Sequence, residues 1–142
     1  MVINISKQYE DGRMDIDTRG KQRFSIVELN HDRPFLQAEV TWFDDDEPAL
    51  PSQAETETAI ELHEQFLEVL GQSAEVDREN LPLSFELARE LPVDLDFKQT
   101  ILEMKSEAER IETLVEYYRA TIPRLEKNMR ARERASTNGH VH

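Results

Sequence analysis

Residues 35–48 read FLQAEVTWFDDDEP, and the character of the chain changes inside this stretch. Up to Phe43, apolar and polar side chains alternate, which predicts a β-strand with Ala38, Val40 and Trp42 on one face. Four consecutive acidic residues follow, and then a proline, which lacks the backbone N–H that a strand ladder needs. The stretch therefore predicts that strands end near residue 43 and that a different kind of structure begins.

The residues before this stretch predict three more strands. Short runs rich in β-branched and apolar residues occupy residues 2–5, 14–18 and 24–29. Turn-forming residues separate them, and Gly12 is placed where a turn needs positive φ. Because the connections are short, we expect an antiparallel meander that ends with the strand over residues 35–43.

Beyond the acidic segment, the pattern is helical. Ser52 and Glu55 have the spacing of a capping box, and an apolar face with helical periodicity runs from there to Gly71. Two shorter helices are expected over residues 84–90 and 94–104, each opened by a residue that can cap a helix.

The last helix is expected to begin at Ser106. Its apolar residues follow steps of three and four through Met129, which is the repeat of a coiled-coil seam. Additional apolar positions widen that stripe, and Pro123 removes one backbone hydrogen bond. We therefore favour intramolecular packing of the first half of this helix, with a bend at Pro123 and a loosely attached basic end beyond it.

Charge and composition exclude several classes of protein. The net charge of −13 is uneven, because residues 44–112 carry 20 acidic and 5 basic side chains. Such a region would repel a phosphate backbone, so we expect no nucleic-acid partner, and the basic residues 124–134 are interpreted as a solvated helix end. We also expect no membrane span and no disulfide, since long apolar runs and cysteines are both absent.

Catalytic and metal-binding motifs find little support. No phosphate-binding loop is present, and Ser25 and Ser84 lack a neighbouring base. Asp15 and Asp17 could form an acid/base pair, but strand alternation places both on a solvated face. His140 and His142 could hold a transition metal only weakly, as two ligands in a tail. We therefore predict no cofactor, no metal site and no catalytic residue.

Several segments together resemble the amino-terminal substrate-binding domain of Lon proteases. Among the strands these are residues 11–14, 19–26 and 34–40, and after the linker they are residues 91–99, 101–103 and 109–111. Their order and spacing agree over most of residues 1–115. The opening strands and first helix that normally precede Val2 are missing from this sequence.

The resemblance implies an α+β fold, with an incomplete PUA-like antiparallel β-barrel followed by a helical bundle. It also implies a non-catalytic, cytoplasmic module that recognises unfolded or degron-bearing polypeptides, because ATP hydrolysis and cleavage belong to other modules of the protease. We divide the chain into a strand part (residues 1–43), an acidic linker (44–51), a helical part of the same domain (52–134) and a disordered tail (135–142).

Phe35, Trp42 and Phe43 are the predicted polypeptide contacts, because aromatic side chains carry much of the energy of protein interfaces. The competing interpretation, that Trp42 and Phe43 belong to the core, stays open. Two alternative functions also stay open: a scaffold that dimerises through the last helix, and a small hydrolase that uses its carboxylates. Finally, we expect self-association through the open sheet edge at residues 2–5.

Overall fold

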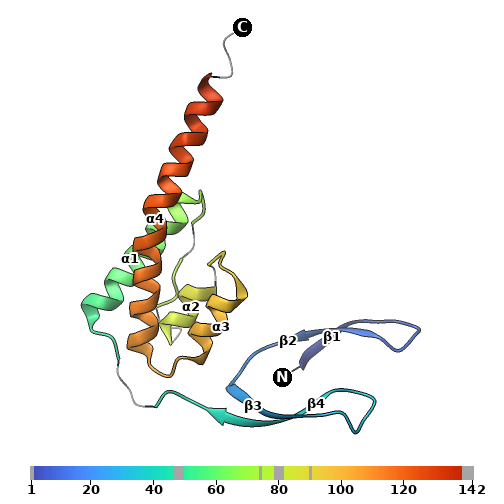
Figure 1. Cartoon of the computed structure of the whole chain (residues 1–142). Coiled ribbons are helices and arrows are strands. Elements are labelled where there is room, and N and C mark those ends of the chain that lie inside the picture. The colour runs from blue at the N-terminus through green and yellow to red at the C-terminus, as the bar shows by residue number, and fades with distance from the viewer. Residues whose placement is uncertain (1, 47–49, 74, 79–81, 90, 139–142) are drawn as a thin grey trace. The chain divides into compact units, whose positions relative to one another are not determined.

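The computed structural model describes residues 2–46, 50–73, 75–78, 82–89 and 91–138. Strands come first and helices second, which confirms the predicted α+β class (Figure 1). The chain divides into two compact units, a strand unit (Met1–Asp44) and a helical unit (Asp45–His142). The two units differ sharply in how much apolar surface they bury.

The strand unit contains two antiparallel hairpins. β1 (Val2–Gln8) pairs with β2 (Met14–Thr18), and β3 (Arg23–Asn30) pairs with β4 (Gln37–Phe43). The turn between β1 and β2 is closed by Gly12, whose N–H donates to the carbonyl of Tyr9 over 3.1 Å. The φ of Gly12 is 87°, a left-handed value that glycine adopts without steric penalty. The predicted turn at this position is therefore confirmed.

The expected four-stranded meander is corrected by the structure. The described strands form two separate two-stranded sheets, and β2 does not pair with β3. A tight hairpin turn between those strands would use a left-handed residue, but positive φ occurs in the described chain only at Gly12 and Gly71. Gly20 does not provide such a turn, so the strands do not merge into one continuous barrel sheet.

The β3–β4 hairpin has one entirely apolar side, which we call the apolar face. Phe24 lies opposite Trp42, and Ile26 lies opposite Val40. A register shift after Ile26 inserts one extra residue, so that the alternation resumes with Leu29 on the same side. The apolar face consists of Phe24, Ile26, Leu29, Ala38, Val40 and Trp42, and the other side carries Arg23, Ser25, Glu28, Glu39, Thr41 and Phe43.

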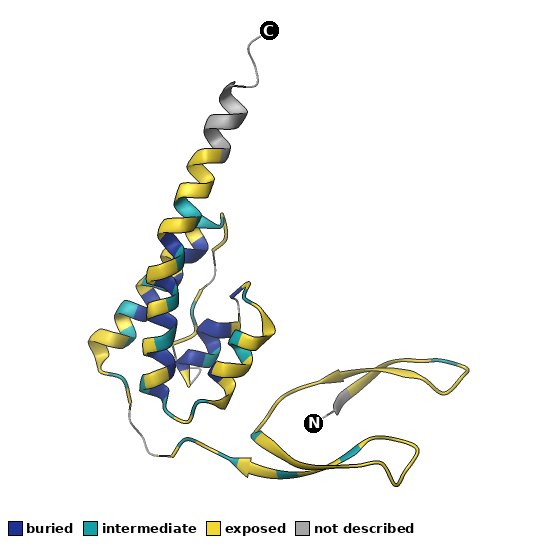
Figure 2. Cartoon of the chain, viewed as in Figure 1, coloured by how far each residue is buried: buried dark blue, intermediate teal, exposed yellow. Residues whose placement is uncertain are grey.

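Most of both hairpins is exposed to solvent (Figure 2). On the apolar face, Phe24 is 50% exposed, Ile26 58% and Trp42 56%. The β1–β2 hairpin is similar, since Ile5 and Ile16 lie opposite one another and remain almost half exposed. Alternation therefore produces amphipathic hairpins, but their apolar sides are not buried in the strand unit.

The helical unit begins with well-capped helices. α1 (Gln53–Val69) opens with the predicted capping box, in which the Ser52 hydroxyl accepts from the N–H of Glu55 and the Glu55 carboxylate accepts from the N–H of Ser52. α1 ends in a Schellman motif, in which Gly71 follows the C-cap Leu70 and has a φ of 70°. The predicted start and end of this helix are confirmed.

Three further helices complete the unit: α2 (Leu83–Arg89), α3 (Leu95–Glu103) and α4 (Glu107–Asn138). The Asp94 carboxylate caps α3 by accepting from the N–H of Phe97. The Ser106 hydroxyl caps α4 by accepting from the N–H of Glu109. α2 and α3 lie within a residue or two of their predicted positions, and α4 begins one residue after its predicted start.

The hydrophobic core lies wholly in the helical unit, where dark-blue buried residues gather in Figure 2. α1 packs along α4, and α2 contacts both α3 and α4. The buried apolar residues are Ala59, Ile60, Phe66, Leu67, Leu83, Leu87, Ala88, Leu91, Ile101, Ile111, Leu114, Val115, Tyr118 and Ile122. The apolar sides of the helices, together with Leu91 from the segment between α2 and α3, thus form one continuous core.

The end of the chain differs from the expectation. α4 continues through Pro123 and reaches Asn138, although we expected a tail without structure from residue 135. The bend expected at Pro123 stays a prediction. Leu125 still packs against the core, whereas Met129 is 43% exposed. One missing backbone hydrogen bond does not end a helix that packing holds on the N-terminal side of the proline. Residues 139–142, including His140 and His142, lie outside the described chain.

The location of the core can be tested by truncating one buried side chain. We expect Leu114→Ala, at a fully buried position, to lower the free energy of unfolding by about 2–5 kcal/mol, since it leaves a cavity. Val27→Ala is the control, because Val27 is 61% exposed and should change stability by less than about 1 kcal/mol. Urea denaturation followed by helical circular dichroism measures both, and equal losses would contradict this placement of the core.

Candidate functional site

The apolar face of the β3–β4 hairpin centres on an aromatic pair. The rings of Phe24 and Trp42 lie edge to face with centroids 5.5 Å apart, a favoured geometry for cross-strand aromatics. The pair is about half exposed, and the other four residues of the face carry no polar side-chain atom. A sheet surface of this composition is suited to contact another apolar surface and offers no group for acid/base chemistry.

The three predicted contact residues do not share one surface. Trp42 lies on the apolar face, whereas Phe43 points to the opposite side of β4, with the Arg23 guanidinium 4.8 Å from its ring. Phe35 precedes β4 in the turn region and is 57% exposed. Trp42 is thus no core residue in the described chain, and the three residues remain predicted contacts.

Sequence reasoning missed the partners of Trp42 on β3. Simple alternation from Phe24 and Ile26 leads to Glu28, which hides the fact that Leu29 belongs to the same side. The register shift between Ile26 and Glu28 places Leu29 on the same side of the hairpin as Phe24 and Ile26. The sequence signal of such a bulge is two consecutive apolar residues, Ile26 and Val27, followed by the charged Glu28.

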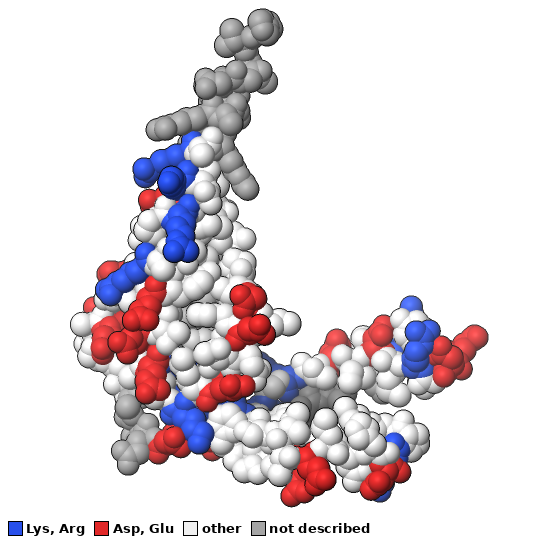
Figure 3. Space-filling model, viewed as in Figure 1, with Lys and Arg blue, Asp and Glu red and all other residues white. Residues whose placement is uncertain are grey.

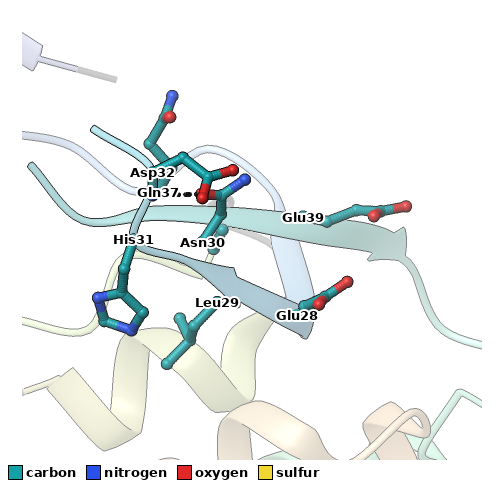
Figure 4. Close-up of a pocket in the computed structure, with 8 residues that line it drawn as sticks. Glu28, Leu29, Asn30, His31, Asp32, Gln37 and Glu39 are labelled. Atoms are coloured by element: carbon teal, nitrogen blue, oxygen red, sulfur yellow. Dashed lines mark hydrogen bonds between the residues drawn. The ribbon is translucent and has the colours of Figure 1, made fainter.

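An open hollow of about 400 Å³ lies at the turn end of the β3–β4 hairpin (Figure 4). Glu28 and Glu39 face each other across the strands there, and His31 and Asp32 come from the turn. The N–H of Asp32 donates to Oδ1 of Asn30 over 2.7 Å, which orders the turn locally. In the described part of the chain, no three His, Cys, Asp or Glu side chains group closely enough to hold a metal ion.

A buried polar network anchors the acidic segment to the helices. Arg110 on α4 is fully buried, and its guanidinium donates to both carboxylate oxygens of Asp45, over 2.8 and 2.7 Å. It also donates to Glu107 over 2.7 Å, to the hydroxyl of Ser84 over 2.8 Å and to the carbonyl of Met104 over 2.9 Å. Asp45, the second residue of the acidic run that we predicted to be a linker, is therefore bound to the helices.

The partners of Arg110 also bind one another. The Glu107 carboxylate accepts from the N–H and the hydroxyl of Ser84, over 2.9 and 2.6 Å. Burial alone would lower the pKa of Arg110, but the hydrogen bonds of Asp45 and Glu107 outweigh it and hold that pKa above its ordinary value. No buried polar side-chain atom among the described residues lacks a hydrogen-bond partner. The network is structural, with its charge compensated inside the fold.

A second buried polar contact joins α1 to α4. Nδ1 of His63 lies 2.8 Å from the hydroxyl of Tyr118, and both side chains are almost fully buried. Burial, with a smaller contribution from Tyr117, raises the pKa of the Tyr118 phenol above its ordinary value. This pair sits inside the core among aromatic rings, away from any described hollow.

The remaining candidates for chemistry are solvated. Asp15 and Asp17 lie on the exposed polar side of β2, and Asp15 accepts a hydrogen bond from the Tyr9 hydroxyl over 2.9 Å. Figure 3 shows basic side chains gathered along the upper part of α4, where Arg130 pairs with Glu126 at 3.6 Å. The proposed coiled-coil seam is occupied within the chain, since Ile111, Val115 and Tyr118 are buried in the core.

The fold is a small α+β domain with one exposed apolar face on the β3–β4 hairpin. Residues 1–119 match the family model described as the ATP-dependent protease La (LON) substrate-binding domain. The chain belongs to this family, which forms the non-catalytic amino-terminal part of Lon proteases. No curated protein matches the chain. Among the described helices, none combines the length and apolar character that crossing a membrane requires.

The Arg110 network makes a strong prediction about stability. Arg110→Met should lower the free energy of unfolding by about 3–5 kcal/mol, because it leaves Glu107 buried without its cation. Lys105→Met is the matched control, since Lys105 pairs with Asp46 at 3.3 Å on the surface and should cost under about 1 kcal/mol. Chemical denaturation measures both variants. If the two variants lost similar amounts of unfolding free energy, the prediction that Arg110 belongs to a buried network would be wrong.

The raised pKa of Tyr118 predicts a loss of stability in alkaline solution. The folded chain holds the phenol proton of Tyr118 more tightly than the unfolded chain does. The protonated phenol therefore adds to the free energy of unfolding in full below about pH 10, the ordinary tyrosine pKa. This stabilisation is lost as the pH rises further. Tyr118→Phe should flatten the fall in unfolding free energy above that pH. Denaturation curves across alkaline pH test this, and identical pH profiles for wild type and Tyr118→Phe would contradict it.

Proposed function

We propose that the chain binds unfolded polypeptides as a recognition module without catalytic activity. The observation that supports this is the apolar face, six apolar side chains on one side of a hairpin that remains exposed to solvent. An exposed apolar surface of this kind marks an interaction site in a soluble protein. Unfolded chains differ from folded ones in presenting apolar side chains, so they are the class of polypeptide that such a surface selects.

Trp42 is the proposed central contact. It has the largest apolar side chain on the face, and its ring is held by the edge-to-face contact with Phe24. Rigid aromatic anchors of this kind dominate binding energy, because little conformational entropy is lost when they are covered. Phe35 and Phe43 are proposed as peripheral contacts, on the turn and on the opposite side of β4.

Family membership supports three further parts of the proposal. The substrate-binding domain of Lon is separate from the modules that hydrolyse ATP and cleave peptides, so we propose that this chain does neither. We also propose that it acts in the cytoplasm. Finally, we propose that the amphipathic hairpins are parts of an incomplete PUA-like barrel, which leaves the apolar face of the β3–β4 hairpin uncovered.

Binding can be tested with dye-labelled unfolded casein. We expect casein anisotropy to rise with the wild-type chain, and Trp42→Ala and Phe24→Ala to weaken binding by about tenfold or more. Thr41→Ala is the matched control, because Thr41 neighbours Trp42 on the other side of β4. Neither ATP hydrolysis nor casein cleavage is expected.

Two outcomes would contradict the proposed function. Measurable ATP hydrolysis or cleavage of casein by the pure chain would make it an enzyme. Equal weakening by Trp42→Ala and Thr41→Ala would remove the apolar face as the binding surface. Phe35→Ala and Phe43→Ala tested beside them show whether the turn and the opposite side of β4 contribute.

A further inference from the structure

The apolar face has the properties of a surface that meets a copy of itself. Six apolar residues face solvent on a sheet of only two strands, and such an isolated hairpin is marginally stable until something covers it. No residue of the face carries a charge or a hydrogen-bonding group other than the indole N–H of Trp42. A partner surface must therefore be equally free of charge, because desolvating unpaired charges against it would be unfavourable.

Charge distribution favours a second copy of the strand unit as that partner. Residues 1–43 carry 6 basic and 7 acidic side chains, so this part is nearly neutral, whereas residues 44–112 carry 5 and 20. A contact between two strand units therefore brings together surfaces of nearly zero net charge, whereas a contact between two helical units would bring together two strongly acidic ones. The space-filling view agrees, since uncharged surface covers much of the visible side of the hairpins (Figure 3).

We propose that two copies of the chain associate face to face through the apolar faces of their β3–β4 hairpins. In this arrangement a two-fold axis places the same six residues on both sides of the interface, and the two sheets pack about 10 Å apart. Trp42 and Phe24 of each copy are then covered by the other copy. This surface replaces the open edge at residues 2–5 as the site of self-association.

The available area places the proposed dimer among small interfaces. With its larger side chains about half exposed, the apolar face offers on the order of 500 Å² per copy. The pair would bury about 1,000 Å² in total, the low end of specific interfaces. We therefore expect a reversible dimer that dissociates in the micromolar range. If the proposed function is correct, polypeptides and the second copy compete for one surface, so dimerisation limits binding at high concentration.

The test is sedimentation of the full chain across a concentration series, without any polypeptide. The mass should rise from 16.6 kDa towards twice that value. Trp42 is the only tryptophan, so its emission should shift to shorter wavelength with the same midpoint as the mass. Ile26→Lys, which places a charge on the apolar face, should stay monomeric, and Ser25→Lys, the same change on the opposite side, should dimerise like wild type.

A further variant covers the case in which Ile26→Lys unfolds the hairpin. Ile26→Thr keeps a β-branched side chain and strand propensity, but removes apolar contact from both copies. Its dissociation constant should rise by about tenfold. A monomer at every concentration would overturn the proposal. So would dimerisation that Asn4→Pro abolishes and Ile26→Lys does not, since that points to the edge of β1. A short-wavelength Trp42 emission that is independent of concentration would overturn it too, because another part of the same chain would then cover the face.

These outcomes are separate from the proposed function. Casein binding without self-association leaves the recognition module intact and removes only the dimer. Self-association without casein binding keeps the interface and removes the proposed ligand. Both measurements use the same full chain. Casein binding is compared between Trp42→Ala and Thr41→Ala, and self-association between Ile26→Lys and Ser25→Lys, so the two failures are distinguished.

Discussion

The packing of the helical unit depends on one buried cation. Arg110 gathers Asp45, Glu107, Ser84 and the end of α3 around a guanidinium that has no exposed surface. A buried guanidinium is tolerated at this position only because its N–H groups have acceptors and its charge has carboxylate partners. The same network holds Asp45, the first residue of the helical unit, against α4, so the point at which the chain enters this unit is set by an ion pair.

Apolar surface is divided unequally between the two units. The helical unit buries its apolar residues around α1 and α4, whereas the strand unit leaves those of both hairpins about half exposed. A two-stranded sheet cannot enclose a core by itself, because its one apolar side has no second layer to pack against. The exposed sides are therefore the surface that we propose for recognition, and the buried core lies in the helical unit.

Much of the fold could be predicted from residue patterns. Ser52 with Glu55, Asp94 and Ser106 mark helix starts, because local side chain to backbone hydrogen bonds decide them. Gly12 and Gly71 mark a turn and a helix end through positive φ. The pairing of β2 with β3 was mispredicted, since hairpin formation there depends on a turn conformation that Gly20 permits but does not impose. The partners of Trp42 were missed because one bulge shifts the alternation of β3.

The sequence by itself determined the order of strands and helices, their caps, and the apolar side of each element, because these follow from interactions between near neighbours along the chain. Only the tertiary structure showed that Arg110 reaches Asp45, 65 residues away, and that Tyr118 meets His63. It also decided that Ile111, Val115 and Tyr118 of α4 are buried in the core of the same chain, whereas Trp42 on β4 is exposed to solvent. Burial depends on which surfaces meet in three dimensions, and periodicity along the chain records only which side of an element is apolar.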